Sequence, residues 1–150
     1  MPYRKLTMVV GFAVALVAAT WGARTLQAQP PGFKRVELQR HDLGTANHEA
    51  VVARGEFNAG AGTPRHTHPG EEIAYILEGQ VVLEIDGKPP VTLKVGDVFF
   101  VPAGQIHAAR NGGQTPAKVL STYVVEKGKP LATPAPPVPA APAKAPAPAK

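Results

Sequence analysis

Three of the five histidines stand, together with one glutamate, at spacings that suit a metal ion. His66 and His68 are two residues apart, and residues two apart in an extended strand point to the same side. Glu72 has the same parity and returns to that side if the chain around Pro69 and Gly70 stays extended. Two imidazoles and a carboxylate would then converge on one point, which is a donor set that divalent transition metals accept.

A fourth ligand is predicted from a second segment. Residues 98–101 form a short apolar run, and Pro102 and Gly104 after it permit a tight turn. The turn would bring the chain back with His107 pointing toward the other three side chains. Because the chain has no cysteine, a metal here must be held by nitrogen and oxygen, which favours Mn, Fe, Co, Ni, Cu or Zn over an iron–sulfur cluster.

Short segments rich in β-branched and aromatic residues surround these ligands, and turn signals built on Gly, Pro, Asn and Asp separate them. The predicted strands are residues 51–57, 73–77, 81–85, 91–95, 98–101 and 119–125. Alternation in two of them predicts a buried face. The residues on that face are Val81, Leu83, Ile85, Val91, Leu93 and Val95. Many short strands with frequent turns indicate an all-β closed barrel or double-sheet jelly roll.

The chain resembles the cupin superfamily at every signature position of that family's two sequence motifs. The matching residues are Gly60, His66, His68, Glu72, Gly79, Gly96, Pro102, Gly104, His107 and Asn111. The resemblance covers residues 33–127 and implies a double-stranded β-helix, a small jelly-roll barrel with a metal inside. Proteins of this family often form homodimers, so the resemblance also implies a homodimer. Asn111 is expected to fix a local bend of the backbone.

A ligand set of three histidines and one glutamate leaves two positions open on a six-coordinate metal, as a catalytic site does for water, O₂ or substrate. The set resembles that of quercetin-dioxygenase-like cupins, of manganese germins and of several isomerases. We therefore expect a metal-dependent, dioxygenase-like oxidoreductase acting on a small organic molecule. The alternative is a metal or small-ligand binding module of the cell envelope without turnover. A barrel without an ion is a third interpretation, in which the inward carboxylate and imidazoles would have only one another as partners, and buried charge is unfavourable unless it is paired.

Other chemically capable residues are expected outside this ligand set. Glu71 and Arg65 have the opposite strand parity and are expected to face solvent. The alternative for Arg65 is a place at the opening, where it would attract an anionic substrate. His41 and His48 are expected to be surface histidines, with a second metal site as the alternative. Asp97, beside a glycine, is expected to be a turn residue.

The predicted wall of the pocket is apolar. Parity places Tyr75 opposite Glu72, whereas Ala74 and Ile76 share the face of Glu72. Tyr123 is a candidate neighbour of the pocket. An uncharged wall favours a hydrophobic or aromatic substrate over a sugar phosphate.

The two ends of the chain differ in composition from the middle. Residues 1–28 combine a basic start (Arg4 and Lys5), an apolar stretch and a small-residue site at 26–28, a pattern typical of a cleaved signal peptide. An uncleaved N-terminal anchor is the alternative. Residues 129–150 are mostly Pro, Ala and Lys, which predicts a disordered, polyproline-like tail, either a solvated end or a spacer that contacts the wall. The domain at 29–128 is therefore expected to be exported, periplasmic or secreted.

The formal net charge of +5 comes from these two ends. They hold six of the 16 basic residues and none of the 11 acidic ones, so the middle is close to neutral. A nucleic-acid-binding domain needs Lys and Arg clustered on the domain itself, which this pattern does not offer. The expected partner is a small molecule, and membrane contact is expected only if the N-terminal segment stays attached.

Overall fold

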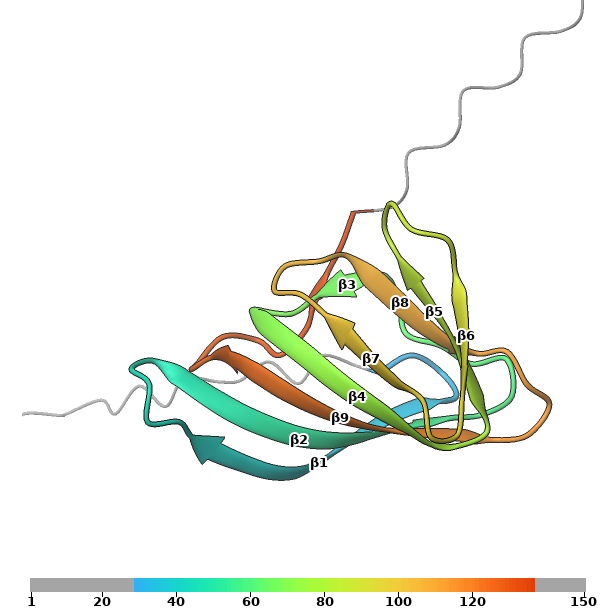
Figure 1. The fold of residues 1–150 in the computed structure, drawn as a ribbon, viewed down its shortest axis with the longest axis horizontal. Helices are drawn as coiled ribbons and strands as arrows, with labels where there is room; N and C mark the ends of the chain where they lie inside the picture. Colours follow the sequence, from blue (N-terminus) through green and yellow to red (C-terminus); the bar gives the residue numbers. More distant parts are fainter. Residues whose placement is uncertain (1–28, 137–150) are drawn as a thin grey trace, which may run out of the picture.

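The computed structural model of this protein describes residues 29–136. The predicted signal segment at 1–28 and residues 137–150 of the predicted tail lie outside the described residues. The described part is all β, as the sequence predicts, and its strands form two sheets that face each other (Figure 1). Between residues 29 and 136, no helix is long and apolar enough to cross a membrane.

Ten strands make up the two sheets. They are β1 (Phe33–Asp42), β2 (His48–Phe57), β3 (His66–Thr67), β4 (Gly70–Glu78), β5 (Gln80–Ile85), β6 (Val91–Lys94), β7 (Val98–Val101), β8 (His107–Asn111), β9 (Ala117–Glu126) and β10 (Thr133–Pro134). One sheet has the order β1-β2-β9-β4-β7 and the other the order β10-β3-β8-β5-β6. All six predicted strands are present, and β1, β3, β8 and β10 are additional.

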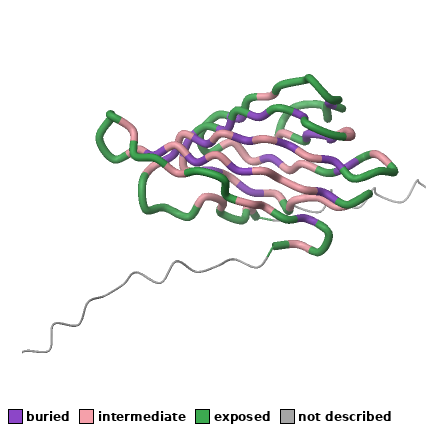
Figure 2. The backbone as a smooth tube through the Cα atoms, turned by 90° about the horizontal axis from the view of Figure 1, so that it is seen from below, coloured by how far each residue is buried: buried purple, intermediate pink, exposed green. Residues whose placement is uncertain are grey.

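Alternating burial shows how these strands build the two layers. In β9 every second residue from Ala117 to Val125 is buried, and the residues between them are half-buried. The first seven residues of β4, Gly70 to Ile76, alternate between buried and exposed. Figure 2 shows the same alternation along the central strands. One face of each central strand therefore lines the space between the sheets, where an inward side chain can become a ligand.

The predicted buried face of residues 91–95 is only partly correct. Leu93 is buried, but Val91 and Val95 are exposed. The reason is that β6 is a four-residue strand at the edge of its sheet and pairs only with β5. Only its middle reaches the interior. The matching prediction for β5 is confirmed, because Val81 and Leu83 are buried and Ile85 packs against them.

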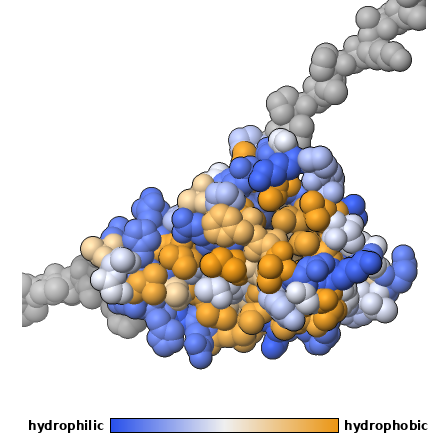
Figure 3. Space-filling view, in the orientation of Figure 1, coloured by the Kyte–Doolittle hydropathy of each residue, from blue (hydrophilic) through white to orange (hydrophobic). Residues whose placement is uncertain are grey.

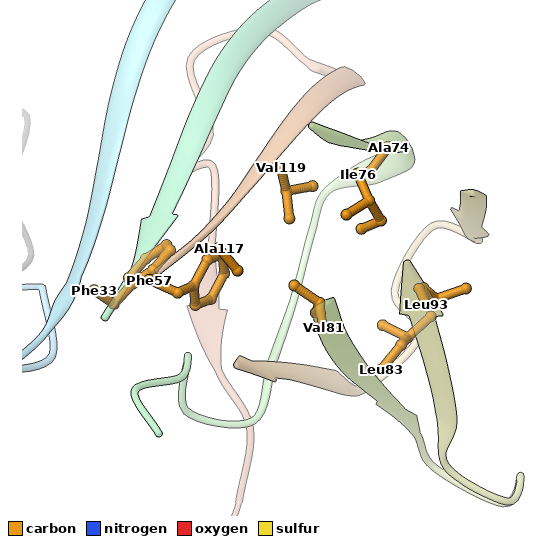
Figure 4. Close-up of a cluster of buried hydrophobic side chains, with 9 residues drawn as sticks. All are labelled: Phe33, Phe57, Ala74, Ile76, Val81, Leu83, Leu93, Ala117 and Val119. Carbon is orange, nitrogen blue, oxygen red and sulfur yellow. The ribbon is translucent and has the colours of Figure 1, made fainter. Parts of the chain in front are cut away.

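The largest apolar cluster fills the interior between the sheets (Figure 4). It consists of Phe33, Phe57, Ala74, Ile76, Val81, Leu83, Leu93, Ala117 and Val119. Val51, Ala53, Tyr123 and Val125 form a second cluster, against which Leu131 packs. Burial of such side chains is the main force that holds the two sheets together.

Gly70 lets the chain cross from one sheet to the other beside the predicted ligands. A Cβ atom at Gly70 would lie 2.0 Å from the carbonyl oxygen of Val124, so no other residue fits here without moving the backbone of β9. Gly79 joins β4 to β5 with a φ of +69°, and a Cβ there would lie 2.6 Å from the carbonyl oxygen of Pro116. The direction of β4, and hence of Glu72, depends on both glycines.

Residues 129–136 differ from the expectation of an unpaired tail. Thr133 and Pro134 form β10, which pairs with β3 opposite Thr67 and His66. The composition argument fails here because two backbone bridges and one apolar side chain, Leu131, are enough to attach the segment to the barrel.

One outer surface of the molecule is apolar. Ile73, Tyr75 and Leu77 on β4 are exposed, as are Val98 and Phe100 on the edge strand β7. Figure 3 shows apolar side chains gathered over these strands. This surface is distinct from the interior that holds the ligands.

Candidate metal centre

The three histidines predicted as ligands meet in the interior. His66 on β3 and His107 at the start of β8 are paired across the two strands, and their ring centroids are 4.3 Å apart. His68 follows β3, and its ring centroid is 4.7 Å from that of His66 and 5.0 Å from that of His107. All three side chains are buried, and one nitrogen from each lies within 4.8 Å of the others. This group has the composition and spacing that could hold a metal ion.

Glu72 enters the same space from the opposite sheet. It is buried on β4, between Val101 of β7 and Tyr123 of β9. Its Oε2 atom is 3.2 Å from Nε2 of His68 and 3.3 Å from Nε2 of His107. The sequence predicted that Glu72 shares one strand face with His66 and His68 and that His107 comes from a different strand. Instead the two sheets face each other, and their inner faces meet at one point.

Backbone carbonyls fix the orientation of all three imidazoles. Nδ1 is 2.8 Å from the Pro64 oxygen in His66, 2.5 Å from the Leu131 oxygen in His68 and 3.0 Å from the Gln105 oxygen in His107. A carbonyl oxygen only accepts a hydrogen bond, so each Nδ1 carries the hydrogen. In the neutral ring, each Nε2 then presents its lone pair to the interior, which is the arrangement that backbone partners impose on metal-binding histidines.

The donor set fits a cation. The Nε2 atoms of His68 and His107 direct their lone pairs at the carboxylate of Glu72. An ionised carboxylate accepts hydrogen bonds but cannot donate one, so neither side of these contacts supplies a hydrogen. Nε2 of His68 is buried and has no hydrogen-bond partner, since its close contact with Glu72 is not aligned as a hydrogen bond. A buried polar atom without a partner is unfavourable. A metal ion at this point would satisfy the lone pairs together.

Burial and mutual repulsion shape the titration of this group. Burial, followed by the nearby charge of His107, lowers the pKa of His66 from 6.5 to about 4. Burial alone would raise the pKa of Glu72, but its close contacts with the imidazoles of His107 and His68 outweigh burial and hold that pKa below its usual range. His66 is therefore neutral and Glu72 ionised at neutral pH, which are the forms that bind a metal.

The second motif forms the predicted turn. The amide of Gln105 donates to the Pro102 carbonyl at 3.1 Å, and Gly104 adopts a φ of +69°. The amide of Gly104 donates to the His68 carbonyl at 3.0 Å, so the turn that delivers His107 also holds the backbone at His68. The two motifs therefore support each other directly.

Asn111 joins separate stretches of backbone, as the sequence suggested. It is 1% exposed, and its Nδ2 donates to the carbonyls of Phe57, Asn58 and Thr115 at 2.7 to 3.3 Å. Its Oδ1 accepts from the amide of Gly113 at 2.8 Å. These bonds close the barrel behind β8.

Tyr123 is a neighbour of the site. Its ring lies edge-on to His68, with centroids 4.8 Å apart, and its backbone is paired with that of Glu72. Burial, followed by the charge of Glu72, raises the pKa of Tyr123 well above its usual range. The hydroxyl therefore keeps its proton and can act only as a hydrogen-bond donor or a neutral acceptor.

A cavity opens beside the histidines. Its lining includes His66, Glu72, His107, Tyr123 and Arg35. The rest of the lining is mostly apolar and is made of Phe33, Gly55, Phe57, Thr63, Phe99, Ala109 and Val119. An adjoining hollow shares Phe33, Arg35, Thr63 and His66 and is also lined by Ala132 and Pro134 of the C-terminal segment. A small molecule that enters here would lie next to the histidines.

The competing residues lie outside the cavity. Glu71, Tyr75 and His41 are exposed. Arg65 forms an ion pair with Asp86 and also donates to the Pro136 carbonyl at 2.7 Å, so it is held by the C-terminal segment. His48 on β2 bonds the Ala46 carbonyl at 3.0 Å and is not among the described residues that line the cavity.

Asp97 is the turn residue that the sequence predicts. Its Oδ2 accepts a hydrogen bond from the Lys94 amide at 2.8 Å. Ala74 and Ile76 are buried on the side of Glu72, as expected, and belong to the largest apolar cluster.

Sequence reasoning missed two residues that touch the site. Arg35 lies on β1, a strand that was not predicted and that comes before both motifs in the sequence. The one feature of the sequence that could have indicated it is its spacing of two residues from Phe33, which puts both side chains on the same face of the strand. Leu131 supplies the carbonyl that holds His68. Leu131 lies in a segment whose Pro and Ala content predicted disorder. Every residue has a backbone carbonyl, so no sequence pattern indicates which one will bond a histidine.

A family model described as "Cupin domain" matches residues 53–123. Among curated proteins, the chain is similar to germin-like protein subfamily 2 member 2 of Arabidopsis thaliana, with 36% identity over 77 residues, 48% of this chain and 35% of that protein. It is also similar to dimethylsulfoniopropionate lyase DddQ of Ruegeria pomeroyi, with 46% identity over 52 residues, 35% of this chain and 26% of that protein. The chain thus spans about a third or less of the length of these two relatives.

Solved structures agree on the fold. The crystal structure of DddQ from Ruegeria pomeroyi matches with a TM-score of 0.56 and 28% identity, over 68% of this chain and 51% of that one. Oxalate oxidase in complex with the substrate analogue glycolate matches with a TM-score of 0.54 and 24% identity, over 64% of this chain and 52% of that one, which supports the fold alone. Since the sequence motifs, the sheet topology and the family model point the same way, the chain belongs to the cupin superfamily.

Proposed function

We propose that this protein binds one divalent transition metal through His66, His68, Glu72 and His107 and is a metal-dependent oxidoreductase, dioxygenase-like, for a small organic molecule. The observation that carries the proposal is the set of three buried imidazoles. A backbone carbonyl holds Nδ1 of each ring, so that each Nε2 faces the same interior space, which Glu72 also enters. Such a metal would supply Lewis acidity and, if redox-active, electrons for O₂ chemistry.

The other residues of the cavity have separate roles in this proposal. The apolar wall formed by Phe33, Phe57 and Phe99 would exclude water and bind the apolar part of a substrate. Tyr123 keeps its proton and would donate a hydrogen bond to a polar atom of the substrate. The backbone carbonyl of Leu131 orients His68.

The titratable residues of the cavity favour redox chemistry over acid–base chemistry. Of the titratable groups that line it, His66, Glu72 and His107 are proposed ligands, Tyr123 keeps its proton and Arg35 is a permanent cation. A lyase or isomerase needs a base within reach of the substrate. The described lining offers none except by release of a ligand, so a metal-centred oxidation is the better match.

We further propose that the protein acts outside the cytoplasm and forms a homodimer. Support for export comes from the composition of residues 1–28, and support for the dimer comes from the family resemblance alone. Amino-terminal sequencing of the exported protein and light scattering after gel filtration would measure the two properties.

The first experiment is the metal content of the exported full-length protein, purified without chelators or a His-tag. We expect about one redox-active ion per chain by mass spectrometry and less than a tenth of that in His66→Ala/His68→Ala. The matched control is His48→Ala, which removes a histidine with the same kind of Nδ1 bond to a backbone carbonyl but outside the site. Equal metal in the double variant and the wild type would refute the ligand assignment.

An oxygen-consumption screen against small organic substrates then tests turnover. Oxygen uptake that requires the metal and disappears in the double variant supports the oxidoreductase. The second candidate, a binding module without turnover, is favoured by the absence of a spare base in the described cavity lining. Saturable ligand binding without substrate consumption, or zinc as the resident metal, would favour that candidate.

A further inference from the structure

Arg35 stands out among the arginines of residues 29–136 because its guanidinium has no carboxylate partner. The other arginines in this part of the chain, Arg40, Arg54, Arg65 and Arg110, each form an ion pair with an aspartate or glutamate. Arg35 is half-buried, and a buried cation is unfavourable unless an anion lies near it. Its position must therefore be explained by something other than a protein ion pair.

The fold holds Arg35 at the cavity. The side chain of Gln29 bonds both the amide and the carbonyl of Arg35, which fixes the backbone at this point of β1. Phe33 and Arg35 are two residues apart on β1 and both line the cavity, as does Gly55, the residue paired with Arg35 on β2. A Cβ atom at Gly55 would lie 3.1 Å from the ring of Phe57 and 3.4 Å from that of Phe33, so the aromatic wall of the cavity packs closely against this position beside Arg35.

The guanidinium is oriented by two aromatic rings. Its central carbon lies 5.9 Å from the ring centroid of Phe33 and 5.9 Å from that of Tyr123. Rings at this distance stabilise a cation while leaving the N–H groups at its edge free for another acceptor. Arg35 and His66 line the same cavity and the adjoining hollow.

A fixed cation beside a metal site repels the metal, so the arrangement is favourable only when an anion lies between the two. A planar guanidinium presents paired N–H donors that match one carboxylate. A phosphate dianion carries two negative charges. Among the described residues that line the cavity and the hollow, Arg35 is the only arginine or lysine, so the second charge would have no cationic partner there. The surrounding wall at Phe33, Phe57 and Phe99 suits an apolar body.

We propose that Arg35 is the residue that binds the anionic group of the substrate, and that the substrate is a small carboxylic acid with an apolar body. This rests on the proposed metal site, because the carboxylate is expected to lie between Arg35 and the ion. Arg35 would thus determine specificity, selecting carboxylates over neutral molecules of the same shape.

The test compares butyrate with butyramide, two probes of nearly equal shape that differ in charge. Their dissociation constants are measured by NMR titration on the full-length, metal-loaded protein after its metal content has been determined. We expect the wild type to prefer butyrate by at least tenfold. Arg35→Gln should weaken butyrate binding about 10- to 100-fold, as expected for loss of a charge-assisted pair, and leave butyramide unchanged.

Two further variants separate charge from packing. Arg35→Lys retains the charge and should recover part of the butyrate affinity. Arg54→Gln removes a half-buried arginine on the neighbouring strand β2 that is ion-paired with Glu56, and it should bind both probes like the wild type.

The outcomes distinguish this inference from the metal proposal. If Arg35→Gln keeps its metal and binds butyrate as tightly as the wild type, or if the wild type does not discriminate between the probes, the role of Arg35 is overturned while the metal site stands. If the wild type holds no metal, the proposed function fails first. A loss of butyrate binding in Arg35→Gln that persists in this metal-free protein would still support Arg35 as the anion-binding residue.

Discussion

Nδ1 of His68 donates to the backbone carbonyl of Leu131 at 2.5 Å, across 63 residues of sequence. Leu131 also packs against the apolar cluster that contains Tyr123, so the same residue contacts the site through its backbone and the core through its side chain. The segment at residues 129–136 therefore helps to build the candidate metal centre. This relationship makes the C-terminal segment testable by truncation.

Truncation after Gly128 is expected to weaken metal binding about 10- to 100-fold, the usual effect of removing a partner that orients a metal-binding histidine. The truncated chain loses the acceptor for His68 and the pairing of β10 with β3. Competition with a chromogenic chelator measures the change. Truncation after Pro136 keeps every described contact and serves as the control. Equal affinities in the two truncated proteins would show that the carbonyl of Leu131 does not matter.

Glu72→Gln should reduce metal content strongly, because it removes the negative charge that offsets the charge of the cation. The neighbouring carboxylate offers a matched control. Glu71 is adjacent in sequence but exposed, so Glu71→Gln should retain the metal content of the wild type. Mass spectrometry of both variants, purified in parallel, gives the comparison. A loss of metal in both would point to a general effect on β4 and away from a ligand role for Glu72.

The metal-free protein should lose stability as the pH falls from 6.5 toward 4. In this range an unfolded His66 takes up a proton, whereas in the folded chain burial and the charge of His107 hold its pKa at about 4. The unfolded state then binds more protons, so the free energy of unfolding decreases by up to about 1.4 kcal/mol per pH unit. Glu72 acts in the same direction below pH 4.5, since its folded pKa lies below its usual range.

Urea unfolding of chelator-treated protein between pH 7 and pH 5 isolates the histidine effect, because most carboxylates stay ionised there. His66→Ala should flatten the dependence, and His48→Ala should retain it. A wild-type unfolding free energy that is constant over this range would contradict the assigned protonation state of His66.

The sequence was sufficient to predict that the three histidines meet, because the signals that place them are local. Parity and turn chemistry bring His66, His68 and His107 to one side of their strands, and the structure groups these three side chains. The all-β class could likewise be predicted, since alternation and turn residues act over a few positions. The arrangement of the strands in two sheets depends on pairings between distant segments, such as β2 with β9, which no local pattern contains.

The features that escaped prediction share a physical cause. Val91 has a core-like pattern but lies on an edge strand, and edges are defined only by which strands pair. The contribution of Leu131 comes from a backbone carbonyl, which every residue possesses. Arg35 is informative only because it has no acidic partner among the described residues, and partners are a property of the folded chain.

Asn111→Ala should destabilise the fold by about 1–3 kcal/mol and leave the metal ligands in place. Asn111 is almost fully buried, and its loss would remove the donor that the carbonyls of Phe57, Asn58 and Thr115 share and leave a small cavity in its place. Urea unfolding of the metal-loaded protein measures the change. Asn58→Ala is the control, because its exposed side chain is removed while its carbonyl stays. If both variants unfold at the same urea concentration as the wild type, the bonds of Asn111 do not stabilise the barrel, and closure behind β8 must come from apolar packing alone.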